Sequence, residues 1–224
     1  MALTLVIGNK NYSSWSFRPW IAMKAAGIAF TDRVISLNDP EFKPTLAQVT
    51  PAGKVPVLVD GDVHVWESLA ILEYVAEKFP AAALWPTDAA ARAHARAIAA
   101  EMHAGFVPLR RHCPMNFWRP VKRRDLTAEV AANVARIDAM WGECRARLGA
   151  GGPFLFGRFS AADAMYAPVV SRFQTYDVQV GPVSRGYMDA VMALPAWAEW
   201  RDAAVKEPWV LAEDEPDWPT VLRA

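Results

Sequence analysis

Two adjacent serines follow the first apolar segment of the chain, in NKNYSSWSFRPW at residues 9–20, and an arginine comes four or five positions after them. The first turn of a helix beginning here would offer free backbone amides and the positive end of the helix dipole. A serine hydroxyl at such a position can cap the helix, or it can lower the pKa of a bound thiol by stabilising the thiolate. The residue types leave both roles open for Ser13 and Ser14.

A second polar pair, Glu67-Ser68, precedes the apolar helical segment LAILEYVAEKF. Ser68 suits an N-cap or first-turn position and Glu67 is favoured by the helix dipole, so capping is the simpler interpretation. The same pair could bind an α-amino acid head group, because Glu67 accepts from an ammonium while the free amides and the Ser68 hydroxyl donate to a carboxylate.

The segment KVPVL, residues 54–58, places Pro56 where a strand should begin. Proline is tolerated at the first residue of an edge strand, because its missing amide costs no ladder hydrogen bond there. A cis Val55–Pro56 bond would instead turn the Val55 backbone outward to pair with an extended, peptide-like ligand. Since only about 5% of X-Pro bonds are cis, the sequence alone favours the edge-strand interpretation.

The remaining reactive residues carry weaker signals. His94 and His103 lack an HExxH spacing and Cys113 and Cys144 form no zinc pattern, so we expect no metal. A serine hydrolase is disfavoured, because no GxSxG motif is present and the histidines offer no evident partner. A basic cluster is usually a solvated face, although it can also hold an anionic substrate. The cluster in this chain comprises Arg110, Arg111, His112 and Arg119.

The first 79 residues read as a small mixed sheet with helices. Apolar segments at 3–7, 30–36, 56–60 and 63–66 predict strands, and the segments at 16–27 and 67–79 predict helices. The order is βαβ, an irregular segment, then ββα. A right-handed crossover makes the first two strands parallel, and a tight turn at Asp60-Gly61-Asp62 makes the last two an antiparallel hairpin.

After Phe79 the chain changes to alanine-rich and helical patterns without a strand signal. A helix begins near Asp88, and residues 125–149 form a long amphipathic helix that ends at Gly149. Ser160 and Asp163 form a capping box before an apolar helix. The second half is therefore expected to be all-helical.

Composition limits the classes of function. The chain has 224 residues, 53% of them hydrophobic, which is enough for a sizeable core. Its 24 basic and 24 acidic residues cancel, so no overall field attracts nucleic acid or an anionic membrane. Only two cysteines and no apolar run of about 18 residues occur, so we expect a cytoplasmic protein that neither spans a membrane nor binds nucleic acid.

In combination, these motifs resemble the cytosolic glutathione transferase family over essentially the whole chain. SSWSFR resembles the SSCSWR signature of the zeta class, the maleylacetoacetate isomerases, and the segments PAGKVPVLVDGDVHVWESLAILEYVAEKFP and GRFSAADAMYAP resemble later parts of the family. The resemblance implies a thioredoxin-like α/β N-terminal domain at 1–80, a linker at 81–90 and an all-α helical-bundle C-terminal domain at 91–224. It also implies a homodimer and glutathione as co-substrate.

The resemblance also assigns residues. Ser13 and Ser14 would activate the glutathione thiol, Val55 with a cis Pro56 would pair with the cysteinyl part, and Lys54 would lie near the glycyl carboxylate. Glu67 and Ser68 would hold the γ-glutamyl end. A second-substrate pocket is expected, by position, at Trp15, His103, Phe106, Arg110 and Met115. Trp15 replaces the cysteine of the zeta motif, and Arg172 lies one turn before the arginine that holds the dicarboxylate in zeta enzymes.

The leading hypothesis is therefore a glutathione transferase that attacks an electrophilic small molecule. One alternative is a glutathione-dependent cis/trans isomerase of an unsaturated diacid, in which Arg110, Arg111 or Arg172 would clamp the anion. A second alternative is a non-catalytic glutathione-binding protein, because a fold does not fix a function.

Overall fold

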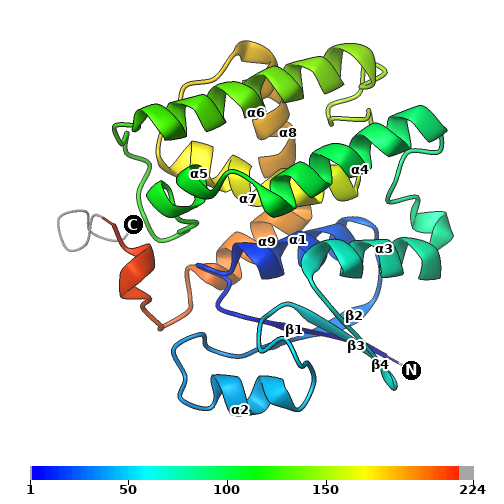
Figure 1. The fold of residues 1–224 in the computed structure, drawn as a ribbon, viewed down its shortest axis with the longest axis vertical. Helices are drawn as coiled ribbons and strands as arrows, with labels where there is room; N and C mark the ends of the chain where they lie inside the picture. The colour runs from blue at the N-terminus through cyan, green and yellow to red at the C-terminus, as the bar shows by residue number, and fades with distance from the viewer. Residues whose placement is uncertain (1, 217–224) are drawn as a thin grey trace.

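The structure, a computed structural model, describes residues 2–216 and contains one four-stranded mixed sheet in its N-terminal half (Figure 1). The strands are β1 (Leu3–Ile7), β2 (Phe30–Val34), β3 (Val57–Asp60) and β4 (Val63–Trp66), in the order β2-β1-β3-β4. β1 and β2 are parallel, whereas β3 pairs antiparallel with β1 and with β4. The predicted crossover and hairpin are confirmed, with Gly61 at φ +61° in the turn.

Helices cover both faces of this sheet. α1 (Ser14–Ala25) and α3 (Ser68–Lys78) lie on the face toward the C-terminal half, and the short α2 (Phe42–Ala47) lies on the other (Figure 1). The prediction of an irregular segment before β3 was wrong at α2. Six residues are too few to show helical periodicity, and it is the burial of Leu46 among core residues of the sheet, Val6 and Val57, that stabilises the helix.

The C-terminal half is helical, as predicted. Asp88 caps its first helix by accepting from the amide of Ala91 at 2.8 Å. The capping box is also confirmed, because the Asp163 carboxylate accepts from the amide and hydroxyl of Ser160. The helices are α4 (Ala89–Ala104), α5 (Val107–His112), α6 (Ala128–Arg147), α7 (Ala161–Thr175), α8 (Pro182–Met192) and α9 (Pro195–Ala204), with 3-10 turns η1 (Pro80–Ala82) and η2 (Ala212–Asp214).

One core joins the two halves. α1 lies between the sheet and the helical half, and its residues pack in the same apolar cluster as nearly all of α7 (Figure 1). Because both helices are buried on almost every side, polar groups on them must find partners within the protein. The first turn of α1 is thereby placed beside side chains of α7.

After α9 the chain returns to the N-terminal half as a strap, residues 205–216. Glu207 accepts from the amides of Lys10 and Asn11 at 2.7 and 3.0 Å, and the Tyr12 hydroxyl donates to Glu215 at 2.6 Å. The strap therefore holds the loop that leads into α1. No helix within residues 2–216 is long and apolar enough to cross a membrane.

Candidate active site

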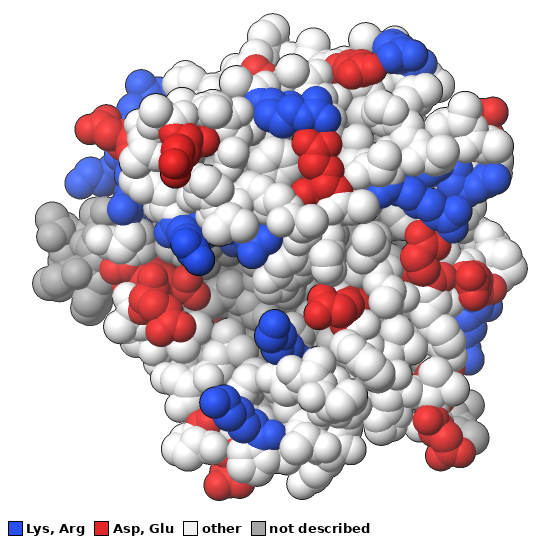
Figure 2. Space-filling model, in the orientation of Figure 1, with Lys and Arg blue, Asp and Glu red and all other residues white. Residues whose placement is uncertain are grey.

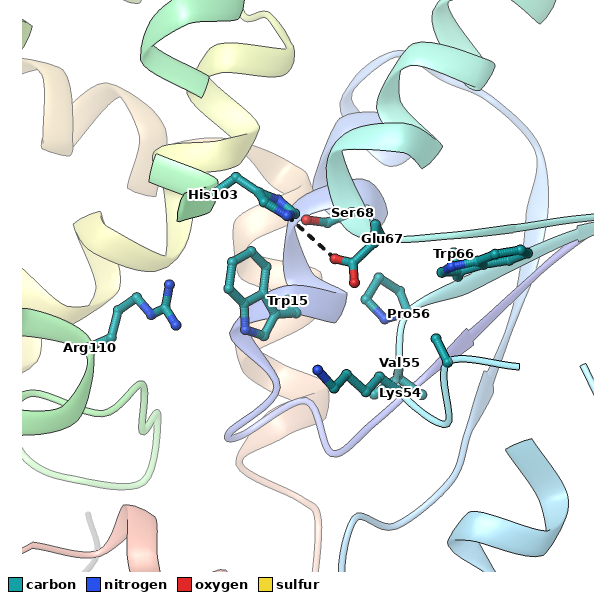
Figure 3. Close-up of a pocket in the computed structure, with 10 residues that line it drawn as sticks. Trp15, Lys54, Val55, Pro56, Trp66, Glu67, Ser68, His103 and Arg110 are labelled. Carbon is teal, nitrogen blue, oxygen red and sulfur yellow. Dashed lines mark ion pairs between the residues drawn. The ribbon is translucent and has the colours of Figure 1, made fainter. Parts of the chain in front are cut away.

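Two adjoining cavities open beside the first turn of α1. The smaller has a volume of about 280 Å³ and the larger about 550 Å³. Trp15, Lys54, Val55 and Arg110 line both, so the cavities share a wall (Figure 3). The smaller is also lined by Ala52, Pro56, Trp66, Glu67, Ser68 and His103. The larger is also lined by Tyr12, Ser13, Ser14, Leu37, Phe42, Gly53, Val107, Arg111, Met115, Arg172 and Asp214.

The two serines differ in their hydrogen bonds, although both line the larger cavity. Ser13 occupies the N-cap position of α1 but its side chain makes no capping hydrogen bond, so the capping interpretation was wrong. Its Oγ instead lies 2.7 Å from Oγ of Ser16, which accepts from the amide of Gly8. Ser14 Oγ accepts from Nη2 of Arg172 at 3.2 Å.

Two buried arginines surround Ser14. Arg18, on α1, donates from Nη1 to the carbonyl of Ser14 at 3.0 Å and from Nε to the carbonyl of Met165 on α7. Arg172 donates to the carbonyls of Cys113 and Pro168 as well as to Ser14. Burial lowers the pKa of both, and that of Arg172 falls to about 10, so its guanidinium stays charged at neutral pH.

Trp15 forms the wall between the cavities. The guanidinium carbons of Arg18 and Arg110 lie 4.1 and 5.0 Å from the centroid of its ring, and His103 packs edge-on at 5.1 Å. Cation–π contacts of this kind fix the plane of the indole. Figure 3 shows the ring between Arg110 and the segment that carries Lys54.

Neither Glu67 nor Ser68 caps α3 through its side chain, so the capping interpretation was wrong for this pair also, although Ser68 does lie in the first turn of α3, as predicted. Glu67 has φ +67°, a conformation that costs a non-glycine residue about 1–3 kcal/mol. Its side chain makes no capping bond; the carboxylate lies 3.5 Å from Nε2 of His103 (Figure 3). Ser68 Oγ is buried and has no hydrogen-bond partner among the described residues. The Glu67 carboxylate, on a strained backbone, lies beside the unpaired hydroxyl of Ser68. This arrangement is suited to a ligand with ammonium and carboxylate groups.

The Val55–Pro56 peptide bond is cis, as the resemblance implied. The edge-strand interpretation was wrong, because Pro56 precedes β3, an interior strand that pairs with both β1 and β4. Val55 lines both cavities, so its backbone borders the space between the serines and Glu67. Lys54 points into the same space (Figure 3).

Two family models match the chain. The N-terminal domain of glutathione S-transferase matches residues 12–78, and the C-terminal domain of the same family matches residues 127–203.

The chain belongs to the glutathione S-transferase family.

Curated relatives of this chain include a probable maleylacetoacetate isomerase of Caenorhabditis elegans, 42% identical over 98 residues, covering 43% of the chain and 45% of the relative. Human glutathione S-transferase theta-1 is 36% identical over 127 residues, covering 53% and 52%. The alignments thus span about half the length of these relatives. The theta class glutathione S-transferase of Xanthomonas axonopodis pv. citri, solved with glutathione bound, has a TM-score of 0.67 and 24% identity, covering 91% of this chain and 99% of its own. The predicted fold, a thioredoxin-like half followed by a helical half, is confirmed.

The expected second-substrate residues do not all line one cavity. Trp15 and Arg110 line both cavities, Met115 lines the larger one, and His103 lines the smaller one beside Glu67. Phe106 lines neither, because its backbone at φ +56° begins α5 and its ring packs in the core. The position of Phe106 in the sequence could not reveal that its backbone directs the ring into the core.

The residues of the basic cluster also lie in different places. Arg110 and Arg111 line the larger cavity, but Arg119 is buried away from it and donates to the carbonyls of Lys122 and Thr175. His112 contacts the carbonyl of Asp125 at 2.8 Å. Of the four residues of the cluster, only Arg110 and Arg111 therefore line the larger cavity.

The larger cavity is strongly basic. Its lining contains four basic side chains and one acidic one, Asp214 of η2, and Figure 2 shows lysine and arginine atoms beside the hollow between the two halves. Burial raises the pKa of Asp214 to about 6. The basic residues are Lys54, Arg110, Arg111 and Arg172. Within residues 2–216, no group of three histidine, cysteine, aspartate or glutamate side chains could hold a metal ion.

Sequence reasoning missed Arg18 and Asp214 as neighbours of the site. The spacing of Arg18 from Ser14, one helical turn, was a usable signal, because residues at i and i+4 meet on one face. Asp214 gave no signal, since only the path of the strap brings it to the larger cavity.

Proposed function

We propose that this protein is a serine-type, zeta-like glutathione transferase, in which a serine at the start of α1 activates the glutathione thiol for attack on an electrophilic small molecule. The observation that carries the proposal is the unpaired, buried hydroxyl of Ser68 beside Glu67, in a cavity that adjoins the one lined by Ser13 and Ser14. An amino acid head group held at the first pair would direct a short peptide toward the serines.

The smaller cavity would bind the peptide along its length. Ser68 and the free amides at the start of α3 would donate to the γ-glutamyl carboxylate, and Glu67 would accept from the ammonium. The Val55 backbone would pair with the cysteinyl unit, and Lys54 would attract the glycyl carboxylate. All four residues line the smaller cavity, which supports the assignment.

The serine hydroxyl would donate a hydrogen bond to the thiolate and so lower the pKa of the thiol, aided by the positive end of the α1 dipole. The thiol proton leaves to solvent. The sulfur electron pair then forms a bond to the electrophilic carbon, and the leaving group departs with the pair of the bond that breaks. Holding both reactants in adjoining cavities supplies proximity, and no covalent enzyme intermediate is needed.

A second candidate is the isomerase of an unsaturated diacid, favoured by the four basic side chains that line the larger cavity. Glutathione would add to the double bond, the resulting single bond would rotate, and glutathione would leave. Absence of turnover with maleylacetone-type substrates, alongside conjugation of a neutral electrophile, would reject this candidate.

We also propose a cytoplasmic homodimer. Val63 and Trp66 are large, exposed apolar residues at the two ends of the edge strand β4. An exposed apolar sheet edge favours association with a second protein chain. Both cysteines, Cys113 and Cys144, are buried thiols, which suits a reducing compartment. Analytical ultracentrifugation of the wild type and of Trp66→Glu tests the dimer, because the charged residue should shift the population toward monomer.

The decisive experiment measures glutathione binding by calorimetry together with turnover of a model electrophile. Binding with turnover that is lost in Ser13→Ala/Ser14→Ala is the expected result. Binding without activity across a broad electrophile panel would instead identify a non-catalytic glutathione-binding protein. Unchanged turnover and thiol pKa in both single variants and the double variant would refute serine activation.

A further inference from the structure

Ser14 is held at two points by guanidinium groups that come from different halves of the chain. Arg18, fully buried on α1, fixes its carbonyl, and Arg172, only 4% exposed on α7, donates to its hydroxyl oxygen. Ser14 and Arg172 are 158 positions apart. The orientation of this hydroxyl is therefore set by the packing of α1 against α7.

The hydrogen bonds distinguish the two serines as donors. A hydroxyl has one hydrogen to donate and lone pairs to accept with. The Ser14 oxygen accepts from Arg172, so its own hydrogen remains available to an acceptor in the larger cavity, which Ser14 lines. Ser13 shares a hydrogen bond of 2.7 Å with Ser16, in which either hydroxyl can donate, and no cation donates to its oxygen among the described residues. Because a donor bonded to a cation is polarised, Ser14 is the stronger donor.

The charges around Ser14 also favour an anion. Neither Arg18 nor Arg172 forms a salt bridge within residues 2–216; all the hydrogen bonds they make go to carbonyl oxygens and to Ser14. Among residues 2–216, Asp214 is the one acidic side chain in the lining of the larger cavity. The charged groups facing Ser14 or its cavity are Arg18, Lys54, Arg110, Arg111, Arg172 and Asp214.

We propose that Arg172 is a positioning residue for thiol activation: it orients the Ser14 hydroxyl so that Ser14, rather than Ser13, donates to the glutathione thiolate, and its charge adds to that stabilisation. The inference rests on the proposed function. All three nitrogen atoms of Arg172 are already hydrogen-bonded to the protein, which fits a fixed positioning group better than a clamp that must adapt to a substrate carboxylate.

The test is the pKa of enzyme-bound glutathione, followed by the ultraviolet absorbance of the thiolate, with calorimetry for affinity and circular dichroism for folding. The variants are Ser13→Ala, Ser14→Ala, Arg172→Gln, Arg172→Lys and the double variant Ser14→Ala/Arg172→Gln. Arg145→Gln is the matched control, since Arg145 also donates to two backbone carbonyls, those of Gly152 and Phe154, but lines neither cavity.

Arg172→Gln and Ser14→Ala are each expected to raise the pKa of the bound thiol by about 1 unit. At any pH below the wild-type pKa, roughly tenfold less thiolate would then be present. The double variant should show little further shift, because both changes remove one coupled interaction. Arg172→Lys keeps the positive charge but lacks the planar guanidinium with its several N–H donors. The thiol pKa in this variant should lie between those of the wild type and Arg172→Gln. Glutathione affinity should change less than about threefold, since the peptide is held mainly in the smaller cavity.

A wild-type thiol pKa in Arg172→Gln that still binds glutathione overturns the inference and leaves the proposed function standing. So does a higher KM in Arg172→Gln for carboxylated electrophiles only, with the thiol pKa unchanged, because Arg172 would then be a substrate clamp. If Arg172→Gln fails to fold, Ser14→Ala and Arg172→Lys carry the test, and wild-type pKa values in both overturn it. A wild type that does not lower the thiol pKa of glutathione refutes the proposed function itself.

Discussion

Replacing Ser68 with alanine should stabilise the free protein and weaken its binding of glutathione. Ser68 is 1% exposed, and its Oγ has no hydrogen-bond partner among the described residues. A buried, unsatisfied hydroxyl carries a desolvation penalty of about 1–3 kcal/mol, and removing it leaves a void of only one oxygen atom. We therefore expect a gain of about 1 kcal/mol, which raises the Tm of a chain of this size by about 2–4 °C.

The same change removes a proposed hydrogen bond to the γ-glutamyl carboxylate. A hydrogen bond to a charged group contributes about 1.5–3 kcal/mol, so Ser68→Ala should weaken glutathione binding at least about tenfold. The opposite signs of the two effects are the signature of a polar group kept for a ligand. Thermal unfolding with and without glutathione, and calorimetric titration, measure both effects.

Ser171→Ala provides the matched control. Ser171 is a buried serine whose Oγ also lacks a partner among the described residues, but it lies on α7 and lines neither cavity. Its replacement should raise the Tm by a similar amount and leave glutathione affinity unchanged. A lower Tm and wild-type affinity in Ser68→Ala would refute the reasoning.

Three further outcomes are expected. Glu67→Gln should weaken glutathione binding about tenfold in calorimetry, because it removes the charge that faces the ammonium, and equal affinity would contradict that role. Leu46→Ala should lower the free energy of unfolding by about 2–4 kcal/mol in urea denaturation, since Leu46 is fully buried between α2 and the sheet. A loss below about 1 kcal/mol would contradict this expectation, because it would mean that neighbouring side chains fill the space that Leu46 leaves. Burial raises the pKa of Asp163 from 3.8 to about 6, so the folded state binds this proton more tightly than the unfolded chain does. The protonated Asp163 therefore contributes fully to stability below about pH 4, and this contribution is lost as the pH rises through 6. Relative to Asp163→Asn, the wild type should therefore lose up to about 3 kcal/mol between pH 4 and 7 in urea unfolding, and parallel pH profiles would contradict the shift.

Local patterns determined most of the fold. The strands, the hairpin at Gly61 and the capping box of Ser160 and Asp163 depend on residues close together in the chain, so their signals survive in the sequence alone. The order of motifs then identified the family. The short helix α2 was not predicted, because its stability comes from the contact of Leu46 with the sheet and not from a periodic pattern of its own.

The candidate site depended more on tertiary structure. Ser13, Ser14, Glu67 and Ser68 could be selected by type and position, since residues at helix starts favour ligand binding and capping alike. Whether these side chains cap a helix was decided by contacts that the sequence does not reveal: Ser13 shares a hydrogen bond with Ser16, and the Ser68 hydroxyl has no partner among the described residues.

The sequence by itself determined that a serine-rich helix start and a Glu-Ser pair belong to one thioredoxin-like half, because those motifs are local. Only the tertiary structure decided that Arg172 reaches Ser14, that Phe106 turns into the core and that the strap carries Asp214 to the larger cavity. Each of these depends on segments far apart in the chain that meet through packing of a shared core, and no local pattern encodes such a meeting.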